Sequence, residues 1–287
     1  MPKNLLITGC SSGIGQACAL HFDRAGWRVF AGVRREEDAR RLTGQASERL
    51  QPLYLDVTRP PSIAVAAGEL SAIVGDEGLQ GLVNNAGTAR GGPLEFVPLE
   101  AFRQVFEVNV FGLLAVTQAA LPLLHAGRGR IVNIGSVSGR VTTPLIGPYC
   151  ASKYALESMS DALRMELLPH GLYTSVIEPG VVRTPIWDKA IELETAAAGQ
   201  LPEEAHRRYG TIMTALFRLL DSMADRAIPV ERVVHAVEHA LVSARPRPRY
   251  LLGRDARRRV VLQWLLPRRW MDALVLWYLR RLALRAA

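Results

Sequence analysis

The stretch "YCASKYALES" places a tyrosine and a lysine four residues apart, where a loop rich in Gly and Pro gives way to a helical pattern. On a helix, Tyr149 and Lys153 share one face of the same turn. A phenol has a reference pKa near about 10 and is a poor base at neutral pH, but an ammonium group within about 4 to 6 Å lowers that pKa. The pair therefore predicts a tyrosine that acts as acid and base, although a Tyr-x3-Lys pair alone is more often a surface pair.

Two further polar residues accompany this pair. Ser136 ends the run "RIVNIGS", which is typical of a buried strand, and Asn109 interrupts the apolar run "FEVNVFGLL". A polar side chain inside such an apolar helix needs a buried hydrogen-bond partner. Asn109, Ser136, Tyr149 and Lys153 are therefore the candidate catalytic residues.

The segment "TGCSSGIG" follows the first apolar run and leads directly into a helical pattern. Its glycines, Gly9, Gly13 and Gly15, allow a tight turn, a close approach of a phosphate to the backbone, and close packing of the helix on the strand. The helix N-terminus offers free N–H groups to an anion. The spacing G-x3-G-x-G is weak evidence alone, but its position at the first strand-to-helix turn predicts a nucleotide site.

The residues after the second predicted strand bear on the choice of nucleotide. The tripeptide Val33-Arg34-Arg35 stands where a site specific for NAD would hold an acidic residue for the ribose hydroxyls. The Arg34 guanidinium can pair with a 2′-phosphate, so we expect NADP(H) to be preferred over NAD(H). Two alternatives stay open: the segment is a solvated helix start, because three acidic residues follow, or Glu36 binds the ribose.

Asp56 ends the third predicted strand, in "YLDVT". A carboxylate at the carboxyl end of a strand could accept a hydrogen bond from an adenine amino group. Capping of the following turn is an equally good role for it.

Short apolar runs alternate with longer helical stretches over the first 252 residues. The runs are apolar on both faces, which predicts an α/β fold with a doubly wound parallel sheet of the Rossmann type, in a single domain over 1–252. One long helix is expected over about Leu99–Leu124. A composition shift at "SARPRPRYLLG" predicts a last strand and then an appended amphipathic helical tail over 253–287. The other predicted strands are "NLLIT", "WRVFAGV", "PLYLDV", "GLVNNAG", "GRIVNIGS" and "LYTSVIEPG".

Several of these motifs together resemble the classical short-chain dehydrogenase/reductase family, over about residues 3 to 252. The matching segments are T-G-x3-G-I-G (Thr8–Gly15), "NNAG" (Asn84–Gly87), the four candidate catalytic residues and "PGVVRT" (Pro179–Thr184), in the family's order and spacing. The cysteine in "TGCSSGIG", the Val-Arg pair and the long segment after "PGVVRT" are most similar to the 17β-hydroxysteroid and retinol dehydrogenase branch.

The resemblance implies a role for each candidate, and it implies no metal. Tyr149 would donate a proton to a carbonyl oxygen in reduction, or remove one from an alcohol in oxidation, and Ser136 would stabilise charge on the same oxygen. Lys153 would lower the pKa of Tyr149 and hold the nicotinamide ribose, and Asn109 would position a water that connects Lys153 to solvent. Hydride would pass directly between the nicotinamide and the substrate carbon. The implied cofactor contacts are Gly9, Ser11, Ser12, Gly13, Ile14, Gly15, Arg34, Asp56, Val57, Asn85, Ala86, Gly87, Tyr149, Lys153, Pro179, Gly180, Val182 and Thr184.

These features predict an NADP(H)-dependent oxidoreductase that interconverts a bulky apolar alcohol, such as a steroid or retinoid, with its ketone or aldehyde. Residues of about 186–226 are expected to form a helical lid whose Ile186, Trp187 and Phe217 face the substrate. The alternative within enzymes is a reductase of 3-oxoacyl thioesters or small polar carbonyls. The alternative of another class is a non-catalytic regulator that binds NADP(H).

The net charge of +8 is concentrated near the C-terminus. From Arg245 to Ala287 the chain has twelve arginines, no lysine and two aspartates, a net charge of +10, which leaves −2 for the rest. The apolar stretch from Trp270 to Leu279 is too short to span a bilayer, which takes about 20 residues. Arginines beside Trp and Leu predict a helix in a membrane interface, while the alternative is packing over the lid or a second subunit. No nucleic-acid-binding motif accompanies the basic residues, so nucleic acid is not an expected partner.

The remaining expectations concern location and assembly. The three cysteines form no disulfide or metal spacing, and "MPKNLLITGC" lacks the parts of a signal peptide, so we expect a cytoplasmic protein, at most peripheral at a membrane. The family resemblance implies a homo-oligomer, a dimer or tetramer built through helices over about Leu99–Leu124 and Tyr149–Leu168. The motif "HAVEH" (His235–His239) matches a metalloprotease pattern, but no third ligand is evident, and it is interpreted as a solvated helix face.

Overall fold

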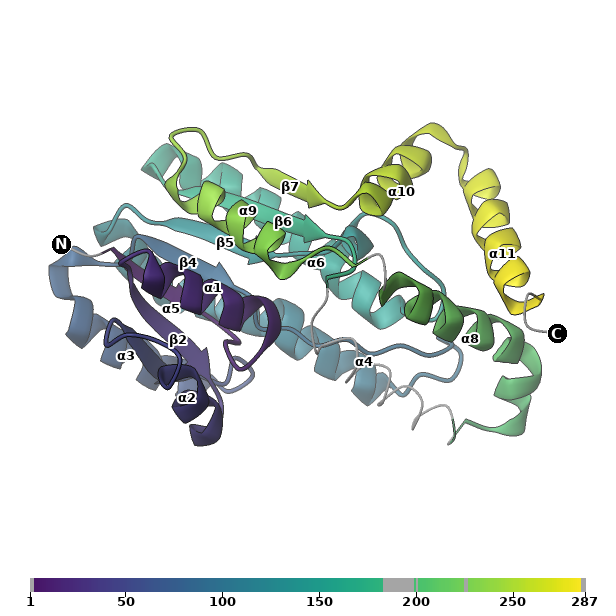
Figure 1. Cartoon of the computed structure of the whole chain (residues 1–287), viewed down its shortest axis with the longest axis horizontal. Helices are drawn as coiled ribbons and strands as arrows, with labels where there is room; N and C mark the ends of the chain where they lie inside the picture. The colour runs from purple at the N-terminus through teal and green to yellow at the C-terminus, as the bar shows by residue number, and fades with distance from the viewer. Residues whose placement is uncertain (1–2, 183–198, 200, 225–226, 285–287) are drawn as a thin grey trace.

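The computed structural model describes residues 3–182, 199, 201–224 and 227–284. Its centre is a parallel sheet in the order β3-β2-β1-β4-β5-β6-β7 (Figure 1). Each run predicted to be a strand contains one, and the strand predicted last forms one edge. The direction of winding reverses between β1 and β4, which is where sheets of this kind bind ligands. The strands are β1 (Asn4–Ile7), β2 (Arg28–Val33), β3 (Leu50–Tyr54), β4 (Gly81–Asn84), β5 (Arg130–Ile134), β6 (Tyr173–Pro179) and β7 (Arg249–Leu252).

Helices cover both faces of the sheet, because successive side chains of a strand point to opposite sides. Leu5 and Ile7 of β1 belong to one buried cluster, and Leu6 between them belongs to the other. The first cluster lies under α1 (Gly13–Arg24) and α9 (Val230–Val242). The second lies under α3 (Pro60–Val74), α5 (Leu113–Ala126) and α6 (Gly147–Leu167). The doubly wound fold predicted from the sequence is confirmed.

The long helix predicted over about Leu99–Leu124 is present and has an unusual centre. It consists of α4 (Leu99–Phe106), a π-helical segment η2 (Glu107–Gly112), and α5. Segments of this type occur often at functional sites, and η2 contains Asn109. Among the described residues, Leu99–Ala126 is the one helix long and apolar enough to cross a membrane, but it packs against α3 and α6 as a layer of the fold.

The last described segment folds back onto α8 (Glu203–Ala224), which is the described helix of the predicted lid. β7 passes through Gly253, whose φ of 106° favours glycine, into α10 (Arg254–Leu265). The following helix, α11 (Arg268–Leu284), lies beside α8 (Figure 1). The tail is helical, as predicted.

Contacts between α11 and α8 bear on the two interpretations of the tail. Met271 and Leu279 of α11 are buried. Arg218 of α8 donates hydrogen bonds to the carbonyl oxygens of Leu282 and Ala283, at 3.1 and 2.7 Å. A cation at the C-terminal end of a helix also stabilises the helix dipole. The alternative that the tail packs over the lid is therefore borne out for one face of α11.

Candidate active site

The glycine-rich turn between β1 and α1 has the backbone that its sequence predicts. Gly9 and Gly13 have φ angles of 70° and 62°, in the left-handed region that favours glycine. A Cβ on Gly15 would lie 2.3 Å from the carbonyl oxygen of Gly9. The first turn of α1 can therefore pack against this loop only with glycine at position 15.

The N-terminus of α1 is open to an anion. Ser12 is the N-cap residue without a side-chain cap, and the first turn, which begins with Gly13 and Ile14, holds no acidic residue. Free N–H groups and the positive end of the helix dipole suit a diphosphate. The close glycine backbone and this uncapped helix end fit the diphosphate of a nicotinamide nucleotide.

Asn85 fastens the glycine turn to the end of β4. Its side-chain nitrogen donates to the carbonyl oxygens of Thr8 and Gly9, both at 2.9 Å. The Thr8 hydroxyl accepts from the backbone N–H groups of Asn85 and Ala86, also at 2.9 Å. Asn85 and Ala86 thus lie beside the turn, and Thr8 is a supporting residue that the glycines of the motif do not reveal.

The two arginines that follow β2, Arg34 and Arg35, differ in their ion pairs. Arg34 is exposed and forms no salt bridge with a described carboxylate, whereas the Nε of Arg35 lies 2.9 Å from Asp38. Of these two arginines, Arg34 is therefore the better suited to meet a 2′-phosphate. Glu36 forms an ion pair with Arg40 one turn along its own helix, which argues against the alternative that it binds the ribose.

A third arginine joins this region from α2 (Glu36–Thr43). Arg41 donates to the carbonyl oxygen of Ser11 at 2.5 Å and to Asp38 at 2.6 Å. The two bonds hold its guanidinium beside the glycine turn and add positive charge there. Packing of α2 against the turn brings Arg41 to this place, so no local sequence pattern could have identified it.

Asp56 caps the turn after β3. Its carboxylate accepts from the backbone N–H and the hydroxyl of Thr58, at 3.0 and 2.8 Å. Burial alone raises the pKa of Asp56, but these bonds and the charges of Arg34 and Arg59 outweigh it and lower the pKa. Of the two roles predicted for Asp56, the capping role is confirmed. Val57 beside it is buried in the core, so its backbone is the part that can face the nucleotide.

Ser136, Tyr149 and Lys153 lie together where β5 ends and α6 begins. Ser136 caps a short 3-10 turn, and its hydroxyl accepts from the Ser138 N–H at 3.1 Å. The Ser136 side chain also lies close enough to the Tyr149 phenol to lower its pKa. The Lys153 ammonium lies 5.7 Å from the centre of the Tyr149 ring and donates to the carbonyl oxygen of Ile134 at 2.8 Å.

Burial dominates the titration of the tyrosine and the lysine. It raises the pKa of Tyr149 to about 12, against a smaller lowering by the Ser136 side chain. It lowers the pKa of Lys153 to about 8, opposed in part by the charge of Glu157. The expectation that Lys153 brings the Tyr149 pKa down is not met in this structure, because desolvation of the phenol outweighs the lowering by Ser136. Tyr149 is protonated at neutral pH, which is the state that donates a proton to a carbonyl oxygen.

Asn109 has a buried partner, as the sequence predicts, in Ser152, and a half-buried one in Thr88. Its side-chain oxygen accepts from the Thr88 N–H at 2.8 Å, and its nitrogen donates to the Thr88 carbonyl oxygen and the Ser152 hydroxyl, both at 2.9 Å. A Cβ on Gly87 would lie 3.4 Å from the Asn109 oxygen and 4.0 Å from the Lys153 nitrogen. Asn109 therefore ties η2 to the loop after β4 and to α6, beside Lys153.

A buried charge network lies behind Lys153. Glu157 is one turn further along α6, and Glu178 on β6 has a side chain only 1% exposed. Arg249 of β7 lies 3.0 Å from Glu157, 3.2 Å from Glu178 and 2.6 Å from Asp161. Burial and the charge of Glu178 raise the pKa of Glu157 to about 7, against the opposing charge of Arg249. The glutamate inside the apolar run "YTSVIEPG" is the one sequence signal for this network.

The segment after β6 runs along the carboxyl end of the sheet. Pro179 ends β6, and Gly180 donates its N–H to β7. Val182 forms an isolated parallel bridge with Ile228. Thr184, the remaining predicted contact of "PGVVRT", lies outside the described residues.

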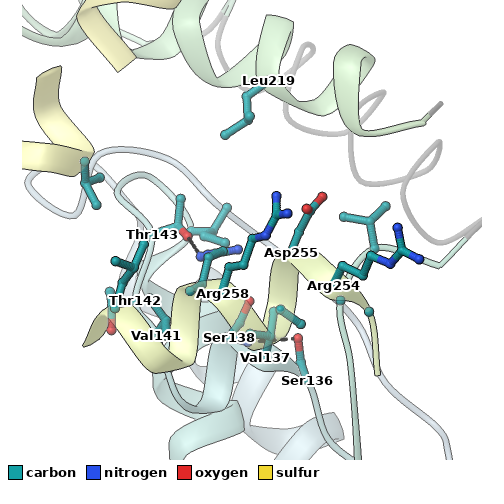
Figure 2. A pocket seen from close by; sticks show the side chains of 18 of the residues that line it. Ser136, Val137, Ser138, Val141, Thr142, Thr143, Leu219, Arg254, Asp255 and Arg258 are labelled. Carbon is teal, nitrogen blue, oxygen red and sulfur yellow. Dashed lines mark hydrogen bonds between the residues drawn. The ribbon is translucent and has the colours of Figure 1, made fainter. Parts of the chain in front are cut away.

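A cavity of about 780 Å³ opens beside Ser136 and continues beneath α8, α10 and α11 (Figure 2). Its lining is largely apolar. The expectation that Phe217 of the lid faces this space is wrong, since Leu216 and Leu219 line it, three residues apart on one face of α8. Ile186 and Trp187 lie outside the described residues.

The tail supplies a wall of the same cavity. Met271, Leu274, Val275, Tyr278 and Leu279 of α11 line it, together with residues of α10. Composition marks this segment as basic and aromatic, but only the path of the chain after β7 shows that it meets the site. The tail is therefore part of the candidate site.

The "HAVEH" segment lies on α9, away from these groups. Nδ1 of His239 lies 2.7 Å from the hydroxyl of Tyr250, and the His235 side chain is 69% exposed. Within the described ranges no group of three potential metal ligands is found. The three cysteines, all described, are free and buried, which fits their interpretation as small core side chains.

The chain is similar to known proteins over nearly its whole length. A family model described as "short chain dehydrogenase" matches residues 3–194. Retinol dehydrogenase 5 of Mus musculus is 39% identical over 289 residues, covering 96% of this chain and 89% of the relative. The NADPH-dependent 3-dehydrocapnine reductase of Ornithobacterium rhinotracheale is 37% identical, covering 93% of this chain and 94% of the relative. A solved short-chain dehydrogenase from Burkholderia cenocepacia J2315, in complex with NADP, is 26% identical with a TM-score of 0.73, covering 96% of this chain and 98% of that one.

The chain therefore belongs to the short-chain dehydrogenase/reductase family and is an oxidoreductase. It lies in the branch of the retinol and 17β-hydroxysteroid dehydrogenases, so the resemblance found in the sequence is confirmed. Proteins of this family bind a nicotinamide cofactor, which the glycine turn and the open end of α1 fit.

Proposed function

We propose that this protein is an NADP(H)-dependent oxidoreductase that interconverts an apolar alcohol and its ketone or aldehyde. The observation that carries the proposal is that Ser136 and Tyr149 lie together, with Lys153 and Asn109 behind them, and that Ser136 lines a large and mostly apolar cavity. Such a lining suits a bulky steroid-like or retinoid-like substrate. The similarity to retinol and hydroxysteroid dehydrogenases supports the same substrate class.

In the direction of reduction, Tyr149 donates its phenolic proton to the substrate oxygen, and the Ser136 hydroxyl stabilises charge on that oxygen. The nicotinamide nucleotide, when bound, supplies the hydride. Lys153 holds the ribose hydroxyls. Asn109 fixes η2 to Ser152, the residue before Lys153, and so positions the ammonium.

The preference for NADP(H) rests on Arg34, which forms no salt bridge with a carboxylate of the described residues, with Arg41 adding charge beside the turn. Replacing Arg34 with alanine should raise the KM for NADPH roughly tenfold or more and leave the KM for NADH nearly unchanged, because a charge-assisted bond to the 2′-phosphate is lost. Arg24→Ala, at the far end of α1, is the matched control. An unchanged ratio of NADPH to NADH use in Arg34→Ala would remove Arg34 from the account. The similarity to an NADPH-dependent reductase and to an NADP-bound structure also supports this preference.

The activity is tested through nicotinamide absorbance at neutral pH, with steroid, retinoid, 3-oxoacyl and small carbonyl pairs. We expect turnover of the lipophilic pairs that falls roughly a hundredfold or more in Tyr149→Phe, which keeps the ring and loses the proton. Tyr154→Phe is the matched control, because Tyr154 lies on the same helix as Tyr149 and its hydroxyl donates instead to the carbonyl oxygen of Arg140, before that helix. Turnover confined to 3-oxoacyl or small carbonyl substrates would show that the substrate is not a bulky apolar alcohol or ketone. Tight NADPH binding without any turnover would make the protein a regulator.

We also propose that residues 1–252 act as the catalytic unit and that 253–287 complete its substrate site at a membrane surface. Trp270, Trp277 and Leu284 are spaced by seven residues, so they share one face of α11, and they are 69%, 54% and 74% exposed. An exposed aromatic face on a strongly basic segment suits peripheral contact with an anionic membrane, from the cytoplasmic side. Flotation with vesicles of phosphatidylserine and phosphatidylcholine, compared with phosphatidylcholine alone, tests this contact.

A homo-oligomer is proposed through the two long helices. Phe111 of η2 is 54% exposed, and Tyr154 and Met165 of α6 are 41% and 60% exposed. Apolar side chains of this size on neighbouring helices suit burial between subunits. Sedimentation of the protein and of its Phe111→Glu variant tests the proposal, because the charge should shift the assembly toward monomers.

A further inference from the structure

Arginines interrupt the apolar lining of the cavity. Four of the lining residues are arginines, and one is acidic. Arg254, Arg258 and Arg259 come from α10, Arg232 comes from α9, and the acidic residue is Asp255. A neutral lipid gives no reason for such an excess of positive charge on the wall that surrounds it.

Within the part of the chain that the structure describes, these arginines are only partly offset, by the charge of Asp255 acting on Arg259. None of the four forms a salt bridge with a described carboxylate, whereas Arg249 contacts three carboxylates in the network behind Lys153. Figure 2 shows Arg254 and Arg258 on α10, across the cavity from Leu219 of α8. A cation held at the edge of an apolar space is stabilised by an anion that enters it.

Arg259 lies nearest to the reacting groups. Its guanidinium donates to the Thr143 hydroxyl at 2.6 Å, and its charge acts on the thiol of Cys150, the residue after Tyr149. Burial lowers the pKa of Arg259, but an arginine keeps its charge at every physiological pH. Its bond to Thr143 uses one of five N–H donors, and a guanidinium with donors left over can hold a second oxygen ligand.

We propose that the cavity binds an anionic amphiphile, with the apolar chain against α8 and α11 and the anionic group, a carboxylate, sulfonate or phosphate, on the arginines of α10. This inference rests on the proposed function, because it names the substrate class of the same site. Leu216, Leu219 and Leu274 offer the apolar surface. A planar guanidinium pairs with two oxygens of such a group at once. A neutral steroid or retinoid has no group that offers two anionic oxygens.

Paired ketones test the proposal directly. The substrates are oxooctadecanoates, with the ketone at successive chain positions, and their methyl esters, used below their micelle concentrations with saturating NADPH. We expect the wild type to prefer the acid to its ester roughly tenfold or more in kcat/KM. In Arg258→Gln and Arg259→Gln, this ratio should fall roughly tenfold, chiefly through KM.

Arg257→Gln is the matched control, because Arg257 is the neighbour of Arg258 on α10 but does not line the cavity. Its ratio of acid to ester should equal that of the wild type. A wild type that prefers the ester at every ketone position would overturn the proposal. So would an equal fall of the ratio in Arg257→Gln and Arg258→Gln.

A binding measurement keeps the test independent of turnover. Calorimetric titration of the NADP⁺-saturated protein with decanoate, decanesulfonate and decyl phosphate should give tighter binding than decanol, and the tightest of the three identifies the anionic group. In Arg258→Gln this advantage should fall roughly tenfold. Equal affinity for decanol and all three anions overturns the inference, even if Arg259→Gln fails to fold. Turnover of neutral ketones without preference for acids refutes this inference alone, while absence of turnover with any ketone refutes the proposed function.

Discussion

Replacing Lys153 with methionine should abolish turnover and yet stabilise the free protein. Burial lowers the pKa of Lys153 to about 8, from an ordinary value of 10.5. At 1.36 kcal/mol per pKa unit, this difference means that the buried ammonium costs about 3 kcal/mol at neutral pH. Loss of the Lys153 bond to the Ile134 carbonyl oxygen removes about 1 kcal/mol of stabilisation. Lys153→Met should therefore raise the free energy of unfolding by about 2 kcal/mol.

The pH dependence of this gain is the sharper test. The native lysine loses its proton near pH 8, whereas the unfolded lysine keeps its proton up to about 10.5. Between these values the unfolded chain binds more protons, so the stability of the wild type rises with pH and the cost of the buried charge disappears. The advantage of Lys153→Met should be complete below about pH 7 and should shrink as the pH rises from 8 toward 10.5.

Urea unfolding measures both the gain in stability and its pH dependence. The wild type and Lys153→Met are compared without added nucleotide, at neutral pH and at a pH between about 8 and 10.5. Lys3→Met is the control, because Lys3 is exposed and lies over the Trp27 ring. It should change stability by less than about 1 kcal/mol, and equally at both pH values. A Lys153→Met protein that is less stable than the wild type at neutral pH, or whose advantage does not shrink with pH, would refute the argument that burial sets the lysine's pKa.

Three further substitutions test other parts of the site. Gly15→Ala places a Cβ 2.3 Å from the Gly9 carbonyl oxygen, so the free energy of unfolding in urea should fall by about 1 to 3 kcal/mol and NADPH should bind more weakly. Gly68→Ala is the control, because its Cβ would meet open space in α3 and should cost no stability. Asn109→Ala leaves buried groups of the loop and α6 unpaired, which should cost about 1 to 3 kcal/mol and reduce kcat, and an unchanged Tm would contradict this role. Arg249→Met leaves the buried Glu157 without its arginine partner, although Glu178 keeps Arg140, and should cost about 3 to 5 kcal/mol in urea unfolding; Arg249→Lys should cost less.

The parts of the site that depend on local geometry could be predicted from the sequence. The φ angles of Gly9 and Gly13 follow from a turn within one short segment. Tyr149 and Lys153 share a turn of one helix, so their spacing alone places them side by side. The sheet order follows in the same way, because alternating strands and helices leave few topologies for a parallel sheet.

The parts that could not be predicted depend on packing between distant segments. Arg41 reaches Ser11 across 30 residues, and Arg259 reaches Thr143 across 116. The raised pKa of Tyr149 is a consequence of burial, which depends on every segment that covers the phenol. Leu216, not Phe217, faces the cavity because of how α8 is rotated about its own axis. The run of apolar residues in α8 does not determine that rotation.

The junction at Gly253 has a consequence for how enzymes of this type can change over evolution. β7 completes the sheet and, one residue later, α10 begins to form the wall of the cavity. The proposed nucleotide contacts all lie before this junction. Recombination here would therefore exchange α10 and α11, which form part of the substrate wall, as one continuous cassette and leave the nucleotide contacts unchanged. The φ of 106° at Gly253 sets the direction in which the cassette leaves the sheet. A glycine kept at this junction would therefore let new specificities be grafted without new folding problems in the sheet.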